Sequence, residues 1–362
     1  QRAFFKFLSL VINLTQYRIT DMCQKNLYIY MNPNNTLISL FISFQSVLSS
    51  ISILIVWSES VVFVVMNTPS NFNKIDTDGA RDFLKRHEWP TGIQNVCIQN
   101  MAKIPVRFMI IDDSGSMAAK DGHRRRVKDN GKIKYDTCSR WEELADVVKF
   151  QAGLSEAAGA YTEFRLLNSG DPVVVGLEPD PNIPIADDLY NRLITTVPTG
   201  GTPLCRHVAA VARQIRKMEP ALKASGQKAS LIICTDGEPS DGDVAEALGL
   251  LYEMPVWVVI CLCTDDQAIV NYWNNIDRNL ELDLEILDDF ISEAKEIANY
   301  NDWFTYGEPL HRLRQFGVCI KELDLLDECS LTVDQIRDVS GSVLYCAVLR
   351  GAVLLYCALL LL

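Results

Sequence analysis

The sequence lacks the cysteine spacing of a zinc ribbon or of a small disulfide-linked domain. It contains 11 cysteines, an odd number, and no two of them form a Cys-x-x-Cys pair. Cys234, Cys261 and Cys263 instead lie in apolar runs that are typical of buried strands. The cysteines therefore predict buried free thiols in a reducing compartment rather than a metal ribbon or a set of disulfides.

Positive charge and histidine are also scarce. The formal net charge is -12, which argues against a general nucleic-acid binder because attraction to phosphate requires a basic face. The same acidic balance is compatible with cation binding. Only four histidines are present, namely His87, His123, His207 and His311. Histidine-dependent catalysis therefore has few candidate bases.

Charged residues are absent from Asn26 to Ser58, within an apolar N-terminal region that we assign to 1–66. The segment 37–57 is long enough to cross a membrane as a helix at about 1.5 Å per residue. Its six serines and Gln45 count against a membrane helix, so a buried helix is the alternative. At the other end, 341–362 is an apolar low-complexity tail, either a second anchor or a translated low-complexity stretch.

These features disagree about the compartment. The basic residues before the apolar segment would place the rest of the chain outside the cell; they are Arg2, Lys6, Arg18 and Lys25. The free thiols favour a cytoplasmic domain, anchored to a membrane if 37–57 spans one.

Between these ends, apolar strands alternate with helices. The runs 106–111, 230–234 and 256–262 predict strands buried on both faces. Amphipathic stretches predict helices at 141–158, 204–218, 243–252 and 290–298, and shorter strands are expected at 163–167, 173–175 and 281–287. This alternation predicts an α/β domain over 104–300, with a mainly parallel central sheet and helices on both faces. A helical lead-in at 67–103 and a helical C-terminal extension at 301–340 flank this domain.

Oxygen-bearing side chains follow two of these strands. Asp112, Ser114 and Ser116 come directly after 106–111, Asp236 comes directly after 230–234, and Thr202 lies on a Gly-Gly-Thr-Pro loop between them. Because ligands of such sheets bind beyond the carboxyl ends of the strands, we expect these side chains to meet there. Hydroxyl and carboxylate oxygens suit Mg²⁺, Mn²⁺ or Ca²⁺ rather than zinc or copper.

The order and spacing of these residues resemble the metal-ion-dependent adhesion site of von Willebrand factor type A (vWA) domains, with no departure at any of the five positions. The resemblance covers 104–263 and implies a Rossmann-like vWA fold. It also implies that Ser114, Ser116 and Thr202 contact the metal, while Asp112 and Asp236 act directly or through water. The expected function is a metal-dependent protein–protein interaction module, not an enzyme, in which an acidic residue of the partner completes the coordination.

Two other interpretations compete with this one. Ser114, Ser116 and Asp236 can each act simply as a helix cap, although capping does not explain why several loops bring oxygens to one edge. A metal-dependent hydrolase is the alternative function, but no general base is evident beside the metal residues. Of the neighbouring acids, we expect Asp113 to be solvated and Glu238 to be a first-turn helix charge.

The segment after the metal loop departs from many vWA domains. About two dozen residues separate Ser116 from Trp141, and most of their charges are positive. The basic residues are Lys120, Arg124, Arg125, Arg126, Lys128, Lys132, Lys134 and Arg140. One interpretation is a solvated loop, and the other is a basic loop that favours acidic partners beside the ion.

Overall fold

The computed structural model describes residues 24–31, 38–45, 50–58, 61–66, 75–127, 133–176, 185–280, 282–318 and 320–339. The chain divides into two compact units, Gln1–Phe72 and Asn73–Leu362, which are described separately.

The first unit contains a four-stranded antiparallel sheet in the order β1-β2-β3-β4. Its strands are β1 (Gln24–Met31), β2 (Ile38–Gln45), β3 (Ser50–Ser58) and β4 (Val61–Met66). The helix expected at 37–57 is therefore wrong, because most of this segment lies in β2 and β3. Ser39 and Ser43, and likewise Ser50 and Ser52, are an even number of residues apart, so each pair falls on one face of a strand, whose period is two. Among the described residues, no helix is both long and apolar enough to cross a membrane.

The second unit is built on a six-stranded sheet in the order β12-β11-β10-β5-β8-β9. Its strands are β5 (Val106–Ile111), β8 (Tyr161–Leu166), β9 (Val173–Val175), β10 (Ala229–Thr235), β11 (Val256–Leu262) and β12 (Leu284–Leu287). Every pair is parallel except β8 with β9. The α/β, Rossmann-like fold expected from the sequence is confirmed.

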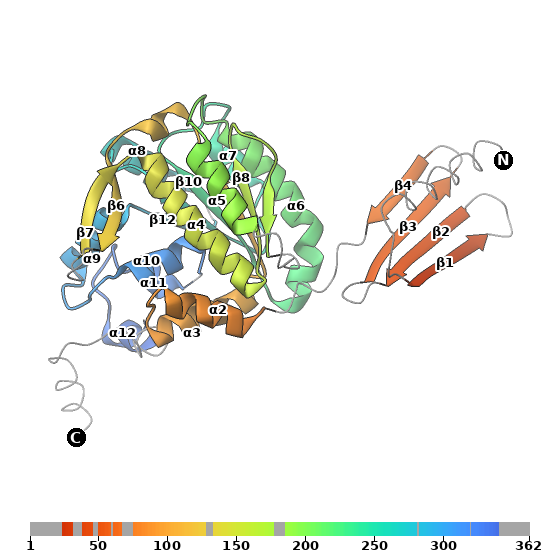
Figure 1. Ribbon diagram of the computed structural model, residues 1–362, viewed down its shortest axis with the longest axis horizontal. Coiled ribbons are helices and arrows are strands. Elements are labelled where there is room, and N and C mark those ends of the chain that lie inside the picture. The colour runs from red at the N-terminus through yellow and green to blue at the C-terminus, as the bar shows by residue number, and fades with distance from the viewer. Residues whose placement is uncertain are drawn as a thin grey trace, which may run out of the picture. The chain divides into compact units, whose positions relative to one another are not determined.

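Helices cover both faces of this sheet (Figure 1). On one face lie α4 (Arg140–Ala158) and α5 (Ile185–Thr195), whose buried side chains pack on Met109, Ile232 and Val259. On the other, α6 (Leu204–Ser225) packs on β10, beside α7 (Val244–Gly249), and α8 (Gln267–Asn279) packs near β12. The helix α5 was not expected from the sequence.

The first helices of the second unit pack against helices from its later part. The helices α2 (Thr77–Arg86) and α3 (Thr91–Lys103) share an apolar cluster with residues of α9 (Phe290–Tyr300), α10 (Glu308–Gln315) and α11 (Lys321–Asp324). Figure 1 shows α3 lying close to α10, although about two hundred residues separate them in the chain. A last helix, α12 (Val333–Val339), comes after α11. The C-terminal extension is thus part of the core of this unit.

Two buried arginines attach the extension to the sheet. Arg107 of β5 donates from Nε to the Phe316 carbonyl at 3.1 Å and from Nη1 to the Ile104 carbonyl at 2.9 Å. Arg314 of α10 is fully buried and forms ion pairs with Glu285 of β12 at 2.6 Å and with Glu293 of α9. Removing either partner of an Arg314 ion pair would leave an uncompensated buried charge. The contacts of both arginines therefore hold the extension in one position.

The basic segment between Ser116 and Trp141 is not an extended solvated loop. It forms a β-hairpin of β6 (Gly122–Val127) and β7 (Ile133–Cys138). Its arginines are paired within the unit: Arg124 with Asp146 at 2.6 Å, Arg125 with Glu308 at 3.0 Å and Arg126 with Asp136 at 2.8 Å. Since each arginine already has an acidic partner, the hairpin offers less free positive charge than the sequence suggested.

Candidate metal site

The order of the strands places two loops next to each other at the carboxyl edge of the sheet. From β5 the chain continues to β8 on one side of β5 and later returns to β10 on the other. The loops that leave β5 and β10 therefore diverge at the switch point of the sheet, where such folds form their ligand crevice. The Asp112 backbone N–H donates to the Cys234 carbonyl at 2.9 Å, which aligns the two loops.

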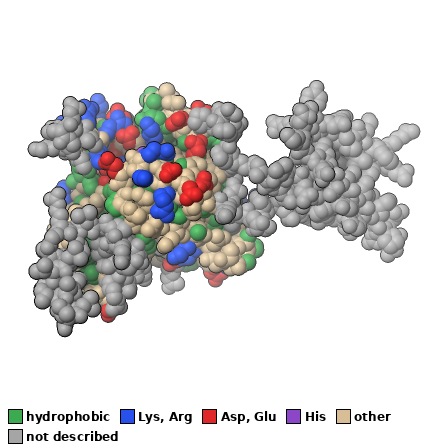
Figure 2. Space-filling view, turned by 60° about the horizontal axis from the view of Figure 1, so that its bottom comes forward, with side chains coloured by type: hydrophobic (Ala, Val, Ile, Leu, Met, Phe, Trp, Pro, Cys, Tyr) green, Lys and Arg blue, Asp and Glu red, His purple; other side chains and the backbone are tan. Residues whose placement is uncertain are grey.

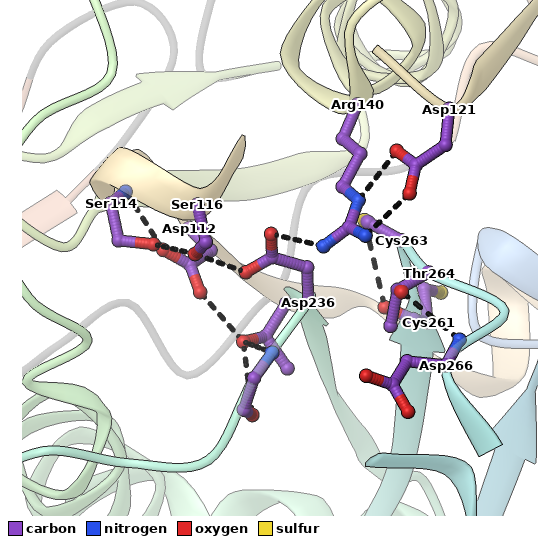
Figure 3. A network of polar contacts seen from close by, with 12 residues as sticks. Asp112, Ser114, Ser116, Asp121, Arg140, Asp236, Cys261, Cys263, Thr264 and Asp266 are labelled. Atoms are coloured by element: carbon purple, nitrogen blue, oxygen red, sulfur yellow. Dashed lines mark hydrogen bonds and ion pairs between the residues drawn. The ribbon is translucent and has the colours of Figure 1, made fainter. Parts of the chain in front are cut away.

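Four of the five expected side chains meet there in one chain of polar contacts (Figure 3). The Oγ atoms of Ser114 and Ser116 are 3.0 Å apart, and Ser116 donates from Oγ to Oδ1 of Asp236 at 2.8 Å. Asp112 accepts from the Ser114 backbone N–H at 2.9 Å. The residues come from both loops, so folding has brought together groups separated by more than a hundred positions.

The helix-capping interpretation fits these contacts poorly. Ser114 does precede the short 3-10 helix η1 (Gly115–Ala118), yet its side chain makes no capping hydrogen bond. The side chains of Ser116 and Asp236 bond to each other, and the helix after β10, α7, is capped by Asp243 instead. These oxygens are therefore directed at one another rather than at helix ends.

The first carboxylate is deeply buried. Asp112 has no exposed surface, and its Oδ2 accepts from the Thr235 hydroxyl at 2.6 Å. Burial raises the pKa of this carboxyl group above its usual value, although the hydrogen bonds from Thr235 and Ser114 oppose the shift. A buried carboxylate of this kind is stabilised by a nearby cation.

Thr202 lies on a loop that is docked on the first loop through the backbone. The Gly115 N–H donates to the Gly200 carbonyl at 3.1 Å, and the Thr199 N–H donates to the Asp113 carbonyl at 2.8 Å. Gly200 has φ +86, the left-handed region that favours glycine. In the described part of the chain, no hydrogen bond joins the Thr202 side chain to the other four residues. The structure therefore places the loop of this threonine against the first loop, with no hydrogen bond from the Thr202 side chain to the cluster among the described residues.

Sequence reasoning missed a second support for that loop. Asp113, expected to be solvated, is 1% exposed and accepts at Oδ1 from the Asn168 backbone N–H at 2.7 Å. The Asn168 side-chain amide donates to the same oxygen at 3.2 Å and to the Gly201 carbonyl at 2.9 Å. Asn168 follows β8, so a third strand end stabilises the threonine loop. The other expected acid, Glu238, is exposed and precedes α7 by several residues rather than lying in its first turn.

Arg140 and Asp121 were also missed as part of the site. Arg140 begins α4 and donates from Nη1 to Oδ2 of Asp236 at 2.8 Å. Its Nε and Nη2 donate to the two carboxylate oxygens of Asp121 at 2.7 and 2.5 Å (Figure 3). From the sequence, Arg140 was only one of many basic residues, and no motif indicated where its side chain would lie.

The donor set suits a small divalent ion. Neighbouring ligand oxygens around octahedral Mg²⁺ lie about 3 Å apart, because each Mg–O bond is about 2.1 Å long. The distances of 3.0 Å between the Ser114 and Ser116 hydroxyls and of 2.8 Å from Ser116 to Asp236 are close to that spacing. No group of three or more His, Cys, Asp or Glu side chains suited to a metal occurs among the described residues. A site made of two carboxylates and three hydroxyls is not such a group.

The oxygen cluster is separate from the larger cavity of this unit. A cavity of about 950 Å³ lies between α2, α4, α10 and the β6–β7 hairpin, with Phe83, Phe150 and Tyr135 in its wall. None of the five expected metal residues lines it. A much smaller cavity, about 40 Å³, is lined by Asp121 and Arg140. The cluster itself reaches the surface at Ser116, which is exposed, whereas Asp112, Ser114, Thr202 and Asp236 are buried.

Charges of both signs share the surface of the second unit. Figure 2 shows a face on which Lys and Arg side chains lie next to Asp and Glu side chains rather than in a separate patch. On this face, therefore, there is no single basic stripe of the kind that binds nucleic acid.

No protein-family model matches the sequence, and no curated protein matches it. Among solved structures, the chain is similar to the crystal structure of the conserved hypothetical protein BatB from Bacteroides thetaiotaomicron, with 19% identity and a TM-score of 0.27. The match covers 43% of this chain and 66% of that one. The mainly parallel α/β sheet is compatible with a vWA-like domain.

Proposed function

We propose that the second unit is a vWA domain that holds one divalent ion, Mg²⁺ or else Mn²⁺ or Ca²⁺, and uses it to bind an acidic residue of a partner protein. The residues that would hold the ion are Asp112, Ser114, Ser116, Thr202 and Asp236. The observation that supports this best is the continuous contact from Ser114 through Ser116 to Asp236, at 3.0 and 2.8 Å. Hard oxygens with this spacing are what Mg²⁺ requires.

The partner's role is inferred from the donor count. Two carboxylates balance a divalent charge, and five side chains leave a coordination position open to an outside oxygen. A carboxylate supplies an oxygen with a negative charge, so an acidic side chain is the protein group best suited to that position.

No contact in the site favours the alternative of a metal-dependent hydrolase. His207, the histidine nearest in sequence to Thr202, lies 3.1 Å from the Leu167 carbonyl through Nε2, and burial lowers the pKa of its ring. Asp121, the additional acid beside the cluster, is occupied by Arg140. Neither is placed as a general base for a water on the ion.

Metal binding is tested by calorimetry with Mg²⁺ on the full chain, followed by proton relaxation with Mn²⁺. An ion with an open position enhances the relaxation of water protons, and added acetate should lower this enhancement by displacing the bound water. Ser116→Ala should weaken binding by roughly tenfold or more. Glu238→Gln, which changes an exposed acid on the loop that carries Asp236, should not change it. Absence of Mg²⁺ binding would refute the proposal, and turnover of nitrophenyl acetate or phosphate with Mg²⁺ would favour the hydrolase.

A further inference from the structure

Arg140 occupies a fixed position at the start of α4. Its backbone N–H donates to the Ala119 carbonyl at 3.0 Å, at the end of the metal loop. The residue before it, Ser139, forms a capping box with Glu142, which fixes the first turn of the helix. The backbone hydrogen bond to Ala119 and the capping box therefore fix the position from which the Arg140 side chain reaches the site. This side chain is only 14% exposed.

The guanidinium bridges two carboxylates of different kinds. One is Asp236, whose side chain is fully buried and bonded to Ser116 through its other oxygen. The other is Asp121, which is 43% exposed and accepts two hydrogen bonds from Arg140 in a fork. Arginine donors match a carboxylate best in this two-bond geometry. Asp236 thus accepts one of the three hydrogen bonds from the guanidinium, and Asp121 accepts the other two.

Arg140 is also the basic side chain that balances the site. Among the ion pairs of the described residues, no other cation contacts Asp112 or Asp236. Two buried carboxylates close together repel each other, and one arginine, which also pairs with Asp121, offsets at most half of their charge. A divalent ion at the same oxygens would cancel all of it, and would then repel the arginine at Asp236.

We propose that Arg140 is an internal counterion that competes with the divalent ion for Asp236, and that Asp121 retains the arginine when the ion binds. This proposal rests on the proposed function, because it concerns the same site. The Mg²⁺ affinity then depends on how strongly Mg²⁺ and the Arg140 guanidinium each interact with Asp236, and not on the oxygen ligands alone. Arg140 lowers the affinity, and Asp121 raises it by drawing Arg140 away from Asp236.

The test measures Mg²⁺ affinity of the full chain by calorimetry for four proteins: wild type, Arg140→Gln, Asp121→Asn and the double variant. Arg140→Gln should bind Mg²⁺ at least about fivefold more tightly, the lower end of coupling between two ligands. Asp121→Asn should bind it more weakly. In the Arg140→Gln background, Asp121→Asn should have almost no further effect, because Asp121 then has no arginine to retain.

Arg124→Gln is the matched control. Arg124 also makes a two-bond pair, with Asp146 at 2.6 and 3.1 Å, but does not contact Asp236. Its removal should leave the Mg²⁺ affinity within about twofold. A second readout is the melting temperature in EDTA, which should fall in Arg140→Gln and be restored by Mg²⁺, since the unbalanced carboxylates then repel each other.

The outcomes separate this proposal from the one on which it rests. If wild type binds Mg²⁺ and Arg140→Gln binds it equally or more weakly, the counterion role is refuted and the metal site stands. If Asp121→Asn weakens binding equally in both backgrounds, Asp121 acts as a general charge and its role is refuted. If no variant binds Mg²⁺, the metal site itself fails and the counterion proposal fails with it. Binding by Arg140→Gln alone would support the counterion role and refute metal binding by the wild-type chain.

Discussion

Substitution of Asp112 best distinguishes a loss of metal binding from a loss of fold stability. Asp112 is a fully buried carboxylate whose two oxygens accept from the Ser114 N–H at 2.9 Å and from the Thr235 hydroxyl at 2.6 Å. In Asp112→Asn the amide oxygen can still accept from Ser114, and the amide nitrogen can donate to the Thr235 hydroxyl. Hydrogen bonds to a charged group are stronger than neutral ones by about 1 kcal/mol each. The neutral amide avoids the free-energy cost of burying a charge, and this offsets the weaker hydrogen bonds. The same cost is why burial raises the pKa of Asp112.

The expected stability of Asp112→Asn in EDTA is therefore within about 1 kcal/mol of wild type. The response to metal should differ much more. At a Mg²⁺ concentration a hundred times the dissociation constant, wild type gains about 2.7 kcal/mol. In a unit of about 290 residues this raises the melting temperature by about 5 °C, at roughly 2 °C per kcal/mol. A tenfold weaker site gains only about half of that at the same concentration.

The assay is thermal unfolding of the full chain, recorded in EDTA and in Mg²⁺, for wild type, Asp112→Asn and the control Glu238→Gln. The control should respond to Mg²⁺ as wild type does, because Glu238 is exposed and outside the cluster. The reasoning is wrong if Asp112→Asn keeps the full response to Mg²⁺. It is also wrong if that variant melts far below wild type in EDTA, since the carboxylate would then have a structural role.

Three further predictions concern the loop and the buried charges. Thr202→Ala should leave the unfolding free energy within about 1 kcal/mol, because one hydroxyl is lost, while Mg²⁺ affinity measured by calorimetry falls; a large loss of stability would indicate a role in the turn. Arg314→Leu should destabilise the unit by about 3–5 kcal/mol in denaturant unfolding, since Glu285 and Glu293 lose their buried counterion; a loss below about 1 kcal/mol would contradict this. Burial raises the pKa values of Glu285 and Asp288 to about 7. The folded state then holds protons that the unfolded state releases between about pH 4 and 7, so melting temperatures should fall as the pH rises through this window, and a rise would refute the assignment.

The sheet could be predicted from the sequence because its strands are buried on both faces. Segments such as 106–111 and 256–262 consist mostly of apolar and β-branched residues, and the structure has strands there with no exposed position. In 37–57, length and the absence of charge suggested a helix, whereas the even spacing of Ser39 with Ser43 and of Ser50 with Ser52 agrees with the strands that form. For a stretch without charges, hydrophobicity alone does not distinguish the two.

At the site, the sequence by itself determined which chemical groups are present and at which strand ends they lie. Asp112, Ser114 and Asp236 directly follow their strands, and parallel strands bring their carboxyl ends to one edge. Tertiary structure decided the rest. Arg140 reaches Asp236 across 96 residues, and Asn168 reaches Gly201 across 33. Side chains that come together from distant elements have no characteristic spacing in the sequence. Their contacts depend on how the whole unit packs, so a sequence motif does not predict them.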